Sequence, residues 1–210
     1  MTTSEELQKA FKYLFVDEVA ALKKLARMLP ANPVVVNIGA GAGTSGLAFM
    51  ESRDDLRKYT IDKQRESSPF GCLEAEGNAL MEAGLYSYDR NDAIKADSKT
   101  VGLNWPMYLR KSWHPHSYLV DLVFIDGDHS YEGAKGDIEA WLPNIKAGGI
   151  LAVHDYHKDE LYQNETDYRD DAPHPQDWPG VTKAVDELLV GKYEIILRID
   201  SLVAFRIEAK

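Results

Sequence analysis

Two acidic residues and a histidine follow the two most apolar segments of the chain and could bind a divalent cation. Asp126 comes directly after residues 119–125, and His154 and Asp155 come directly after residues 150–153. Carboxylate oxygens suit a hard cation such as Mg²⁺, and an imidazole among the ligands favours Mn²⁺, Fe²⁺ or Zn²⁺. Two alternatives stay open: the carboxylates could cap helices or belong to polar loops, and His154 could support the ligands without being one.

Two further side chains beside Asp126 could move a proton. They are Asp128 and His129, in the run Asp126-Gly127-Asp128-His129. A cation makes a bound hydroxyl more acidic, and a nearby base then removes its proton. Asp128, two residues beyond Asp126, is the first candidate for this base. His129 is the alternative, because an imidazole titrates near neutral pH. Either side chain could instead cap a helix that begins near residue 130.

A glycine-rich turn follows the first apolar segment. The run Gly39-Ala40-Gly41-Ala42-Gly43 separates residues 34–38 from an apolar stretch that begins after Thr44 and Ser45. This order predicts a buried parallel strand, a tight loop and a helix whose first turn faces the loop. Glycines let the backbone approach a ligand, and free N–H groups at a helix start favour polar or anionic groups. The spacing departs from the Gly-x-Gly-x-x-Gly dinucleotide pattern, so a purely structural turn is the alternative.

Polar residues at the ends of the next two predicted strands indicate a nucleoside. Asp62 follows the strand after the glycine turn, where a carboxylate can bind ribose hydroxyls. Asp97 and Ser98 follow the strand after that, and their oxygens could accept hydrogen bonds from an adenine amino group. These residues predict a cofactor that contains adenosine, either a dinucleotide or S-adenosylmethionine.

The elements that must position these residues alternate between strands and helices. Such alternation predicts an α/β fold with a doubly wound, mostly parallel sheet, which binds ligands at the carboxyl ends of its strands. The last two strands are joined only by Asp200-Ser201 and should be antiparallel. Strands are expected at residues 33–38, 57–61, 92–96, 119–125, 150–153, 193–199 and 202–207, and helices at 44–52, 71–84, 132–145 and 181–190.

Two regions are expected to be less regular. Residues 98–112 should be partly helical with an interruption at Pro106, and Gly148-Gly149 should turn the chain into the strand at 150–153. At the N-terminus, apolar residues at helical spacing predict one amphipathic helix over residues 4–29, with a capping box formed by Thr3 and Glu6. This helix should pack on the sheet, although it could instead cover a substrate pocket or form a homodimer. We divide the chain into this helical segment, 1–32, and a cofactor-binding domain, 33–210.

Composition limits the partners of the protein. The formal net charge is −10, which argues against nucleic acid or an anionic membrane as the main partner, because both need a basic surface. Cys72 is the single cysteine, so no internal disulfide can form and a reducing compartment fits. Residues 1–6 lack the regions of a signal peptide, and no apolar run approaches the roughly 20 residues of a membrane span. We therefore expect a cytoplasmic protein.

Together these motifs resemble the class I S-adenosylmethionine-dependent methyltransferases. The resemblance rests on residues 35–45, 124–131 and 148–156 with Asp62 and Asp97-Ser98, and it covers roughly residues 34–207. More narrowly, residues 125–131 (Ile-Asp-Gly-Asp-His-Ser-Tyr) and 179–188 are similar to the metal-dependent small-molecule O-methyltransferases, which include macrolide, antibiotic-sugar and cephalosporin-biosynthesis enzymes. The resemblance implies a Rossmann-like, seven-stranded sheet whose last strand is antiparallel.

The resemblance also implies roles for the residues already singled out. Asp128 would be the base, with His129 as its alternative, and a divalent metal, Mg²⁺ before Mn²⁺, Fe²⁺ or Zn²⁺, would bind Asp126, Asp155 and His154. Asn37 and His154 depart from the family, in which both positions are usually acidic. The implied S-adenosylmethionine contacts are Asn37, Gly39, Ala40, Gly41, Thr44, Ser45, Asp62, Asp97, Ser98 and Asp126.

The resemblance to O-methyltransferases implies that a methyl group is transferred from the sulfonium of S-adenosylmethionine to a hydroxyl oxygen of a small molecule. Residues 156–180 could form a lid or a substrate wall, or a disordered surface insertion; residues 103–108 could form a second wall. Two other functions stay open. A non-catalytic cofactor-binding or assembly module is motivated by Asn37 and His154. An NAD(P)-dependent oxidoreductase is disfavoured by the glycine spacing and by the absence of an evident Tyr-x-x-x-Lys pair.

Overall fold

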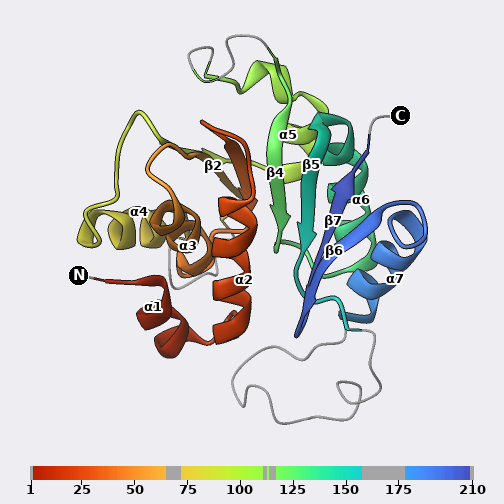
Figure 1. Ribbon diagram of the computed structural model, residues 1–210, viewed down its shortest axis with the longest axis horizontal. Helices are drawn as coiled ribbons and strands as arrows, with labels where there is room; N and C mark the ends of the chain where they lie inside the picture. Colours follow the sequence, from red (N-terminus) through yellow and green to blue (C-terminus); the bar gives the residue numbers. More distant parts are fainter. Residues whose placement is uncertain (1, 65–71, 111–112, 114–116, 158–177, 209–210) are drawn as a thin grey trace.

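A seven-stranded sheet forms the centre of the computed structural model, which describes residues 2–64, 72–110, 113, 117–157 and 178–208 (Figure 1). The strand order is β3-β2-β1-β4-β5-β7-β6. The first five strands pair in parallel, and β7 is antiparallel to both β5 and β6. The predicted Rossmann-like, doubly wound sheet is therefore confirmed. Its strands are β1 (Val34–Ile38), β2 (Arg57–Asp62), β3 (Asn91–Lys95), β4 (Val120–Ile125), β5 (Ile145–Val153), β6 (Glu194–Ile199) and β7 (Leu202–Ile207).

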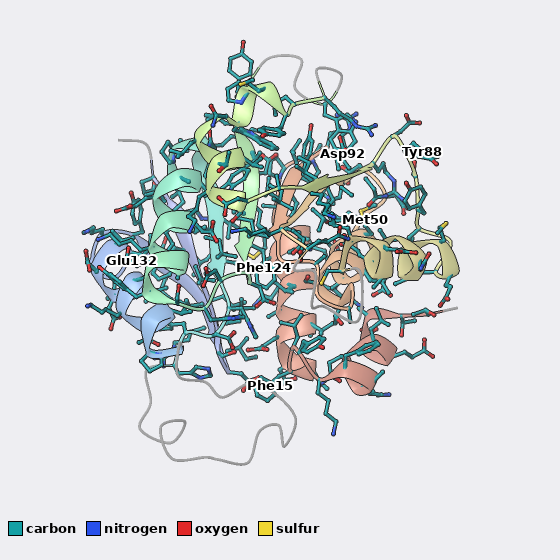
Figure 2. All side chains as sticks on the ribbon, turned by 180° about the vertical axis from the view of Figure 1, so that it is seen from behind. Phe15, Met50, Tyr88, Asp92, Phe124 and Glu132 are labelled. Carbon is teal, nitrogen blue, oxygen red and sulfur yellow. The ribbon has the colours of Figure 1, made fainter. Side chains whose placement is uncertain are left out.

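Helices cover both faces of the sheet, because the central strands bury side chains on both sides. Val35 packs against the helices of one face, whereas its neighbour Val36 packs against those of the other, as the two-residue period of a strand requires. Phe124 of β4 lies near the centre of the molecule, between the two layers (Figure 2). One layer comprises α1 (Ser4–Phe11), α2 (Val16–Arg27), α3 (Thr44–Ser52) and α4 (Cys72–Glu82); the other comprises α5 (Ser98–Leu103), α6 (Tyr131–Trp141) and α7 (Trp178–Leu188), with the short 3₁₀ helices η1 (Trp105–Met107) and η3 (Leu142–Asn144).

The N-terminal segment forms two helices, so the prediction of one helix over residues 4–29 is wrong. α1 ends at Lys12, whose φ of 54° is left-handed and whose N–H donates to the Gln8 carbonyl at 2.8 Å. A new helix then begins where Glu18 accepts a hydrogen bond from the Phe15 N–H at 2.8 Å. The predicted Thr3–Glu6 capping box is confirmed. The expectation of a homodimer was based on a single long helix over residues 4–29, which the structure does not contain.

The second half of the chain differs from expectation in detail. β5 begins at Ile145, so Gly148 and Gly149 lie inside a strand and do not form a turn before it. Gly148 has a φ of +79°, and the β4–β5 register shifts next to this region, which is typical of an irregular strand. α7 begins at Trp178, three positions before the predicted start of 181. Residues 158–177, most of the predicted lid, lie outside the described residues.

No helix in the described part of the chain is long and apolar enough to cross a membrane.

Candidate active site

The parallel strands bring most of the predicted polar residues to one edge of the sheet. A pocket of about 680 Å³ opens there, a volume typical of small-molecule sites. Eight of the predicted residues line it, and they come from the ends of β1, β2, β3 and β4: Gly39, Gly41, Asp62, Asp97, Ser98, Asp126, Asp128 and His129.

The loop after β1 needs a glycine at its first position, Gly39. Gly39 has a φ of +88°, and a Cβ atom there would lie 1.9 Å from the backbone oxygen of Asp126. The loop therefore packs directly against the end of β4. Gly41, by contrast, borders open space, since a Cβ atom added there would have the Tyr13 side chain as its nearest neighbour, at 3.9 Å. Asp62 holds the loop in place by accepting a hydrogen bond from the Ala40 N–H at 2.9 Å.

Three predicted cofactor contacts lie beneath the loop and do not line the pocket. Asn37, Thr44 and Ser45 are buried, and the Ser45 hydroxyl donates to Asn37 Oδ1 at 3.2 Å. They turn inward because α3 starts at Thr44, so its first turn packs against the end of β1. Asn37 Nδ2 and Thr44 Oγ1 are buried without a hydrogen-bond partner among the described residues. In this structure the three side chains therefore support the glycine loop from below and do not face the pocket.

The β3 end of the pocket contains Asp137, an acidic residue that was not predicted from the sequence, beside the predicted Asp97 and Ser98. Asp97 accepts hydrogen bonds from the N–H and hydroxyl of Thr100 and so caps α5. Ser98 donates its hydroxyl to Asp137, a buried residue of α6 that also lines the pocket. Burial raises the pKa of Asp137 to about 6, although the Ser98 hydrogen bond and the charge of Lys99 oppose the shift.

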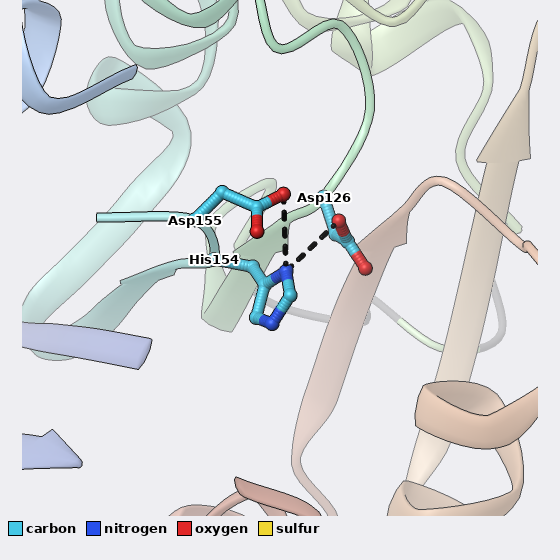
Figure 3. A group of neighbouring side chains, drawn as sticks. All are labelled: Asp126, His154 and Asp155. Atoms are coloured by element: carbon cyan, nitrogen blue, oxygen red, sulfur yellow. Dashed lines mark ion pairs between the residues drawn. The ribbon is translucent and has the colours of Figure 1, made fainter. Parts of the chain in front are cut away.

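The predicted metal ligands are adjacent. Asp126, His154 and Asp155 each offer one ligand atom, and these atoms lie within 4.8 Å of one another. Nδ1 of His154 lies 3.3 Å from Asp126 Oδ1 and 3.3 Å from Asp155 Oδ2, between the two carboxylates (Figure 3). His154 is only 4 % exposed, yet Nδ1 makes no hydrogen bond within the described structure. A buried nitrogen directed at two carboxylates is the geometry that a cation would complete.

The charged groups of this cluster change one another's pKa values. Burial alone would raise the pKa of Asp126, but the charge of His154 and the close contact with His129 lower it to about 2. Burial would also raise the pKa of Asp155. The charge of His154 and the close contact with His129 outweigh burial, so the pKa of Asp155 falls well below its usual value. The pKa of His154 lies well above its usual value, because three carboxylates surround its ring against the effect of burial. The carboxylates therefore stay ionised at neutral pH, as cation ligands must.

His129 reaches this cluster, whereas Asp128 supports the start of a helix. His129 Nε2 lies 2.8 Å from Asp155 Oδ2 and 3.4 Å from Asp126 Oδ1. Burial would lower the pKa of His129, but these two carboxylates raise it to about 10. Asp128 accepts a hydrogen bond from the Ser130 N–H at 3.1 Å, beside the start of α6. The structure thus gives Asp128 the helix-start position that the sequence left open, and places His129 against both carboxylates.

A second set of side chains behind His154 was not expected. Nε2 of His154 lies 3.0 Å from Oε2 of Glu18 in α2 and 3.1 Å from the hydroxyl of Ser201, in the turn between β6 and β7. A sequence signal for Glu18 existed: it shares a helix face with Leu22 and Leu25, where a charged residue is uncommon. Ser201 carried no comparable signal.

A model of a methyltransferase domain matches residues 36–156, more than half of the chain. The chain belongs to this methyltransferase family. The matched segment of this methyltransferase begins within β1 and includes the glycine loop, Asp62, Asp97 and the whole Asp126–His154–Asp155 cluster. The class I resemblance seen in the sequence is thereby confirmed, and the oxidoreductase alternative is set aside.

Comparison with individual proteins supports the fold of the methyltransferase. One relative is the uncharacterized protein R132 of Acanthamoeba polyphaga mimivirus, 34% identical over 74 residues, which are 35% of this chain and 28% of that protein. The O-methyltransferase TomG from Streptomyces achromogenes, determined in complex with SAM, is 18% identical with a TM-score of 0.67 over 98% of this chain and 88% of its own. CalS11, a TDP-rhamnose 3′-O-methyltransferase of calicheamicin biosynthesis, is 18% identical with a TM-score of 0.57 over 90% and 77%. At these identities the two structures establish the shared fold.

Proposed function

We propose that this methyltransferase transfers a methyl group from S-adenosylmethionine to a hydroxyl group of a small molecule, with the assistance of a divalent cation. One observation carries the cation: Nδ1 of His154 is buried, makes no hydrogen bond within the described structure, and faces the ionised carboxylates of Asp126 and Asp155. Two carboxylates and one imidazole suit Mg²⁺, Mn²⁺, Fe²⁺ or Zn²⁺ in an open site. When bound, such a cation supplies Lewis acidity that makes a nearby hydroxyl more acidic.

The pocket fits S-adenosylmethionine along the strand ends. The glycine loop can approach a ligand at Gly41, where a Cβ atom would meet no side chain closer than 3.9 Å. Asp62 uses one lone pair of each oxygen to hold the N–H groups of Ala40 and Gln64, so further lone pairs remain for ribose hydroxyls. Asp97, Ser98 and Asp137 form the far wall, where their oxygens can accept hydrogen bonds from an adenine amino group.

His129 is the residue that would accept the proton of the acceptor hydroxyl. Its ring lines the pocket while Nε2 touches Asp155 and Asp126. These two carboxylates orient the ring and hold the proton of Nε2, so in the neutral ring Nδ1 is the nitrogen that would accept the proton of the hydroxyl. Asp128, on the same wall, orders the start of α6 in this scheme. TomG and CalS11 are both named as O-methyltransferases. Their names support the proposal that this chain also methylates a hydroxyl group.

Calorimetry and turnover test the two halves of the proposal separately. Binding of S-adenosylmethionine to the wild-type protein tests the cofactor half. Titration with Mn²⁺ tests the cation half, and we expect Asp126→Asn and Asp155→Asn to weaken it at least about tenfold. Asp92→Asn is the matched control, because Asp92, on β3, pairs with Arg110 and does not line the pocket. Methyl transfer to a panel of sugars and phenols that persisted unchanged in EDTA, and in both cluster variants, would contradict the assistance by a cation.

A noncatalytic role predicts that the protein binds S-adenosylmethionine but transfers no methyl group. Tight binding of S-adenosylmethionine without methyl transfer to any acceptor, with Mg²⁺, Mn²⁺ and Fe²⁺ each supplied, would identify a cofactor-binding module. The contacts of His129 with the carboxylates of Asp126 and Asp155 favour a catalytic role over a noncatalytic one.

A further inference from the structure

We infer that Glu18, from a helix outside the strand-end motifs, is a positioning residue that fixes the ring of His154 with Nδ1 toward the cation. This inference rests on the proposed cation site. It concerns which nitrogen of His154 is the ligand and which part of the chain decides that choice.

Glu18 is placed to hold one specific edge of the imidazole. Its side chain is completely buried, and Oε2 lies 3.0 Å from His154 Nε2. A carboxylate accepts hydrogen bonds only, so Nε2 must carry the proton in this contact. In the neutral ring the lone pair then lies on the opposite nitrogen, Nδ1, which faces Asp126 and Asp155 and can present it to a cation. A carboxylate behind a ligating histidine fixes the ring in this way in many metal sites.

Ser201 strengthens the same arrangement from the opposite end of the chain. Its hydroxyl donates to Glu18 Oε1 at 2.7 Å and lies 3.1 Å from His154 Nε2, so its lone pair can share the Nε2 proton. The Ser201 N–H donates to the same Oε1 at 2.9 Å. Since the hydroxyl proton is used on Glu18, Nε2 finds two acceptors and no donor. Both contacts therefore select the Nε2–H form of His154.

The backbone contacts of Glu18 make a carboxylate necessary. Oε1 accepts the Ser201 N–H, and Oε2 accepts the Phe15 N–H at 2.8 Å. A glutamine at this position would turn its NH₂ group toward one of these N–H donors in either orientation. It would also remove the negative charge that faces the ring. We therefore expect Glu18→Gln to loosen the ring without removing any direct ligand of the cation.

The test measures cation binding directly, in the full-length protein without S-adenosylmethionine. We expect Glu18→Gln to weaken Mn²⁺ binding about 10- to 100-fold by calorimetry and to shift the visible absorption bands of the Co²⁺-loaded protein. Ser201→Ala should weaken Mn²⁺ binding less, because Glu18 remains. Glu51→Gln is the matched control: Glu51 of α3 anchors Ser4 and Lys23 of the same N-terminal helices and does not touch His154. It should leave both readouts unchanged.

The outcomes separate this inference from the cation site itself. If wild-type protein bound no Mn²⁺, Co²⁺ or Mg²⁺, the proposed function would fail and the inference with it. If wild-type protein bound Mn²⁺ and folded Glu18→Gln protein bound it equally well, the inference alone would be wrong. Should Glu18→Gln fail to fold, a crystal structure of Mn²⁺-loaded wild-type protein decides. We expect Nδ1 of His154 at the ion and Nε2 on Glu18; Nε2 at the ion, or His154 away from it, would overturn the inference.

Discussion

Nε2 of His129 lies 2.8 Å from Oδ2 of Asp155, although the two residues follow different strands. This contact joins the group that would move a proton to the group that would hold the cation. Asp128, the neighbour of His129 in the chain, accepts the Ser130 N–H at the start of α6. We therefore expect substitutions of these two neighbouring residues to change kcat by different amounts.

We expect His129→Gln to lower kcat by about 10²- to 10⁴-fold, the usual contribution of a general base. The affinity for S-adenosylmethionine should change little. Asp128→Asn should have a much smaller effect on kcat, since an amide oxygen can still accept the Ser130 N–H. Steady-state kinetics with any accepted hydroxyl compound measures both variants, and the reverse order of effects would return Asp128 to the role of base.

Asp62 should matter through the glycine loop as well as through the ligand. Its carboxylate holds the Ala40 N–H at 2.9 Å and the Gln64 N–H at 2.7 Å. Charge-assisted bonds of this kind contribute about 1.5–3 kcal/mol each. Asp62→Ala should therefore weaken the binding of S-adenosylhomocysteine about 10- to 100-fold by calorimetry. An affinity equal to that of the wild type would show that Asp62 neither orders the loop nor contacts the ribose.

Two glycine-to-alanine changes should act in opposite directions. In Gly39→Ala the new Cβ would lie 1.9 Å from the Asp126 backbone oxygen, at a φ of +88°. We expect this variant to lose at least about 3 kcal/mol of unfolding free energy or to remain unfolded. Gly77 lies within α4, and a Cβ atom added there would meet nothing within 4 Å, so Gly77→Ala should gain about 0.5–1 kcal/mol. Urea denaturation measures both, and a harmless Gly39→Ala would contradict the packing of β1 on β4.

Asp137 should make stability depend on pH. Its pKa rises from 3.8 to about 6 on folding, so its contribution is fully present below about pH 3.8 and is lost as the pH rises through 6. In Asp137→Asn the amide stays neutral. The variant should therefore gain stability relative to wild type between about pH 4 and pH 8, by up to about 3 kcal/mol. Urea unfolding at both pH values measures this difference; a constant difference would mean that Asp137 titrates normally.

The sequence was informative where local chemistry repeats. Alternating strand and helix patterns located all seven strands, and β1 and β4 were the clearest because a buried parallel strand needs a continuous apolar run. The strand-end residues Asp62, Asp97 and Asp126 were then predictable, since parallel strands end at one edge. The break at Lys12 was not predictable in this way: the apolar face continues through it, and only the left-handed φ and the restart at Phe15 reveal it.

Side-chain direction was harder to predict than position. Asp128 and His129 are adjacent in sequence, and only the folded loop shows that the imidazole turns toward Asp155 while the carboxylate turns toward Ser130. Thr44 and Ser45 illustrate the same difficulty, because their helical turn directs them beneath the loop. Glu18 required knowledge of which helix face meets the end of β5. Such contacts depend on packing between distant segments, which spacing along the chain does not encode.

The hydrogen bonds between Glu18 and Ser201 connect residues 183 positions apart. A nascent chain emerges from the ribosome in order, so strands β1 to β5 and the glycine loop are all available before Ser201 is. The contacts that Ser201 makes with Glu18 and His154 can therefore form only after the β6–β7 hairpin has been synthesised. A ribosome-bound chain stalled ahead of that hairpin would therefore contain every residue that lines the pocket but would lack Ser201, the second hydrogen-bonding partner of Glu18 and His154.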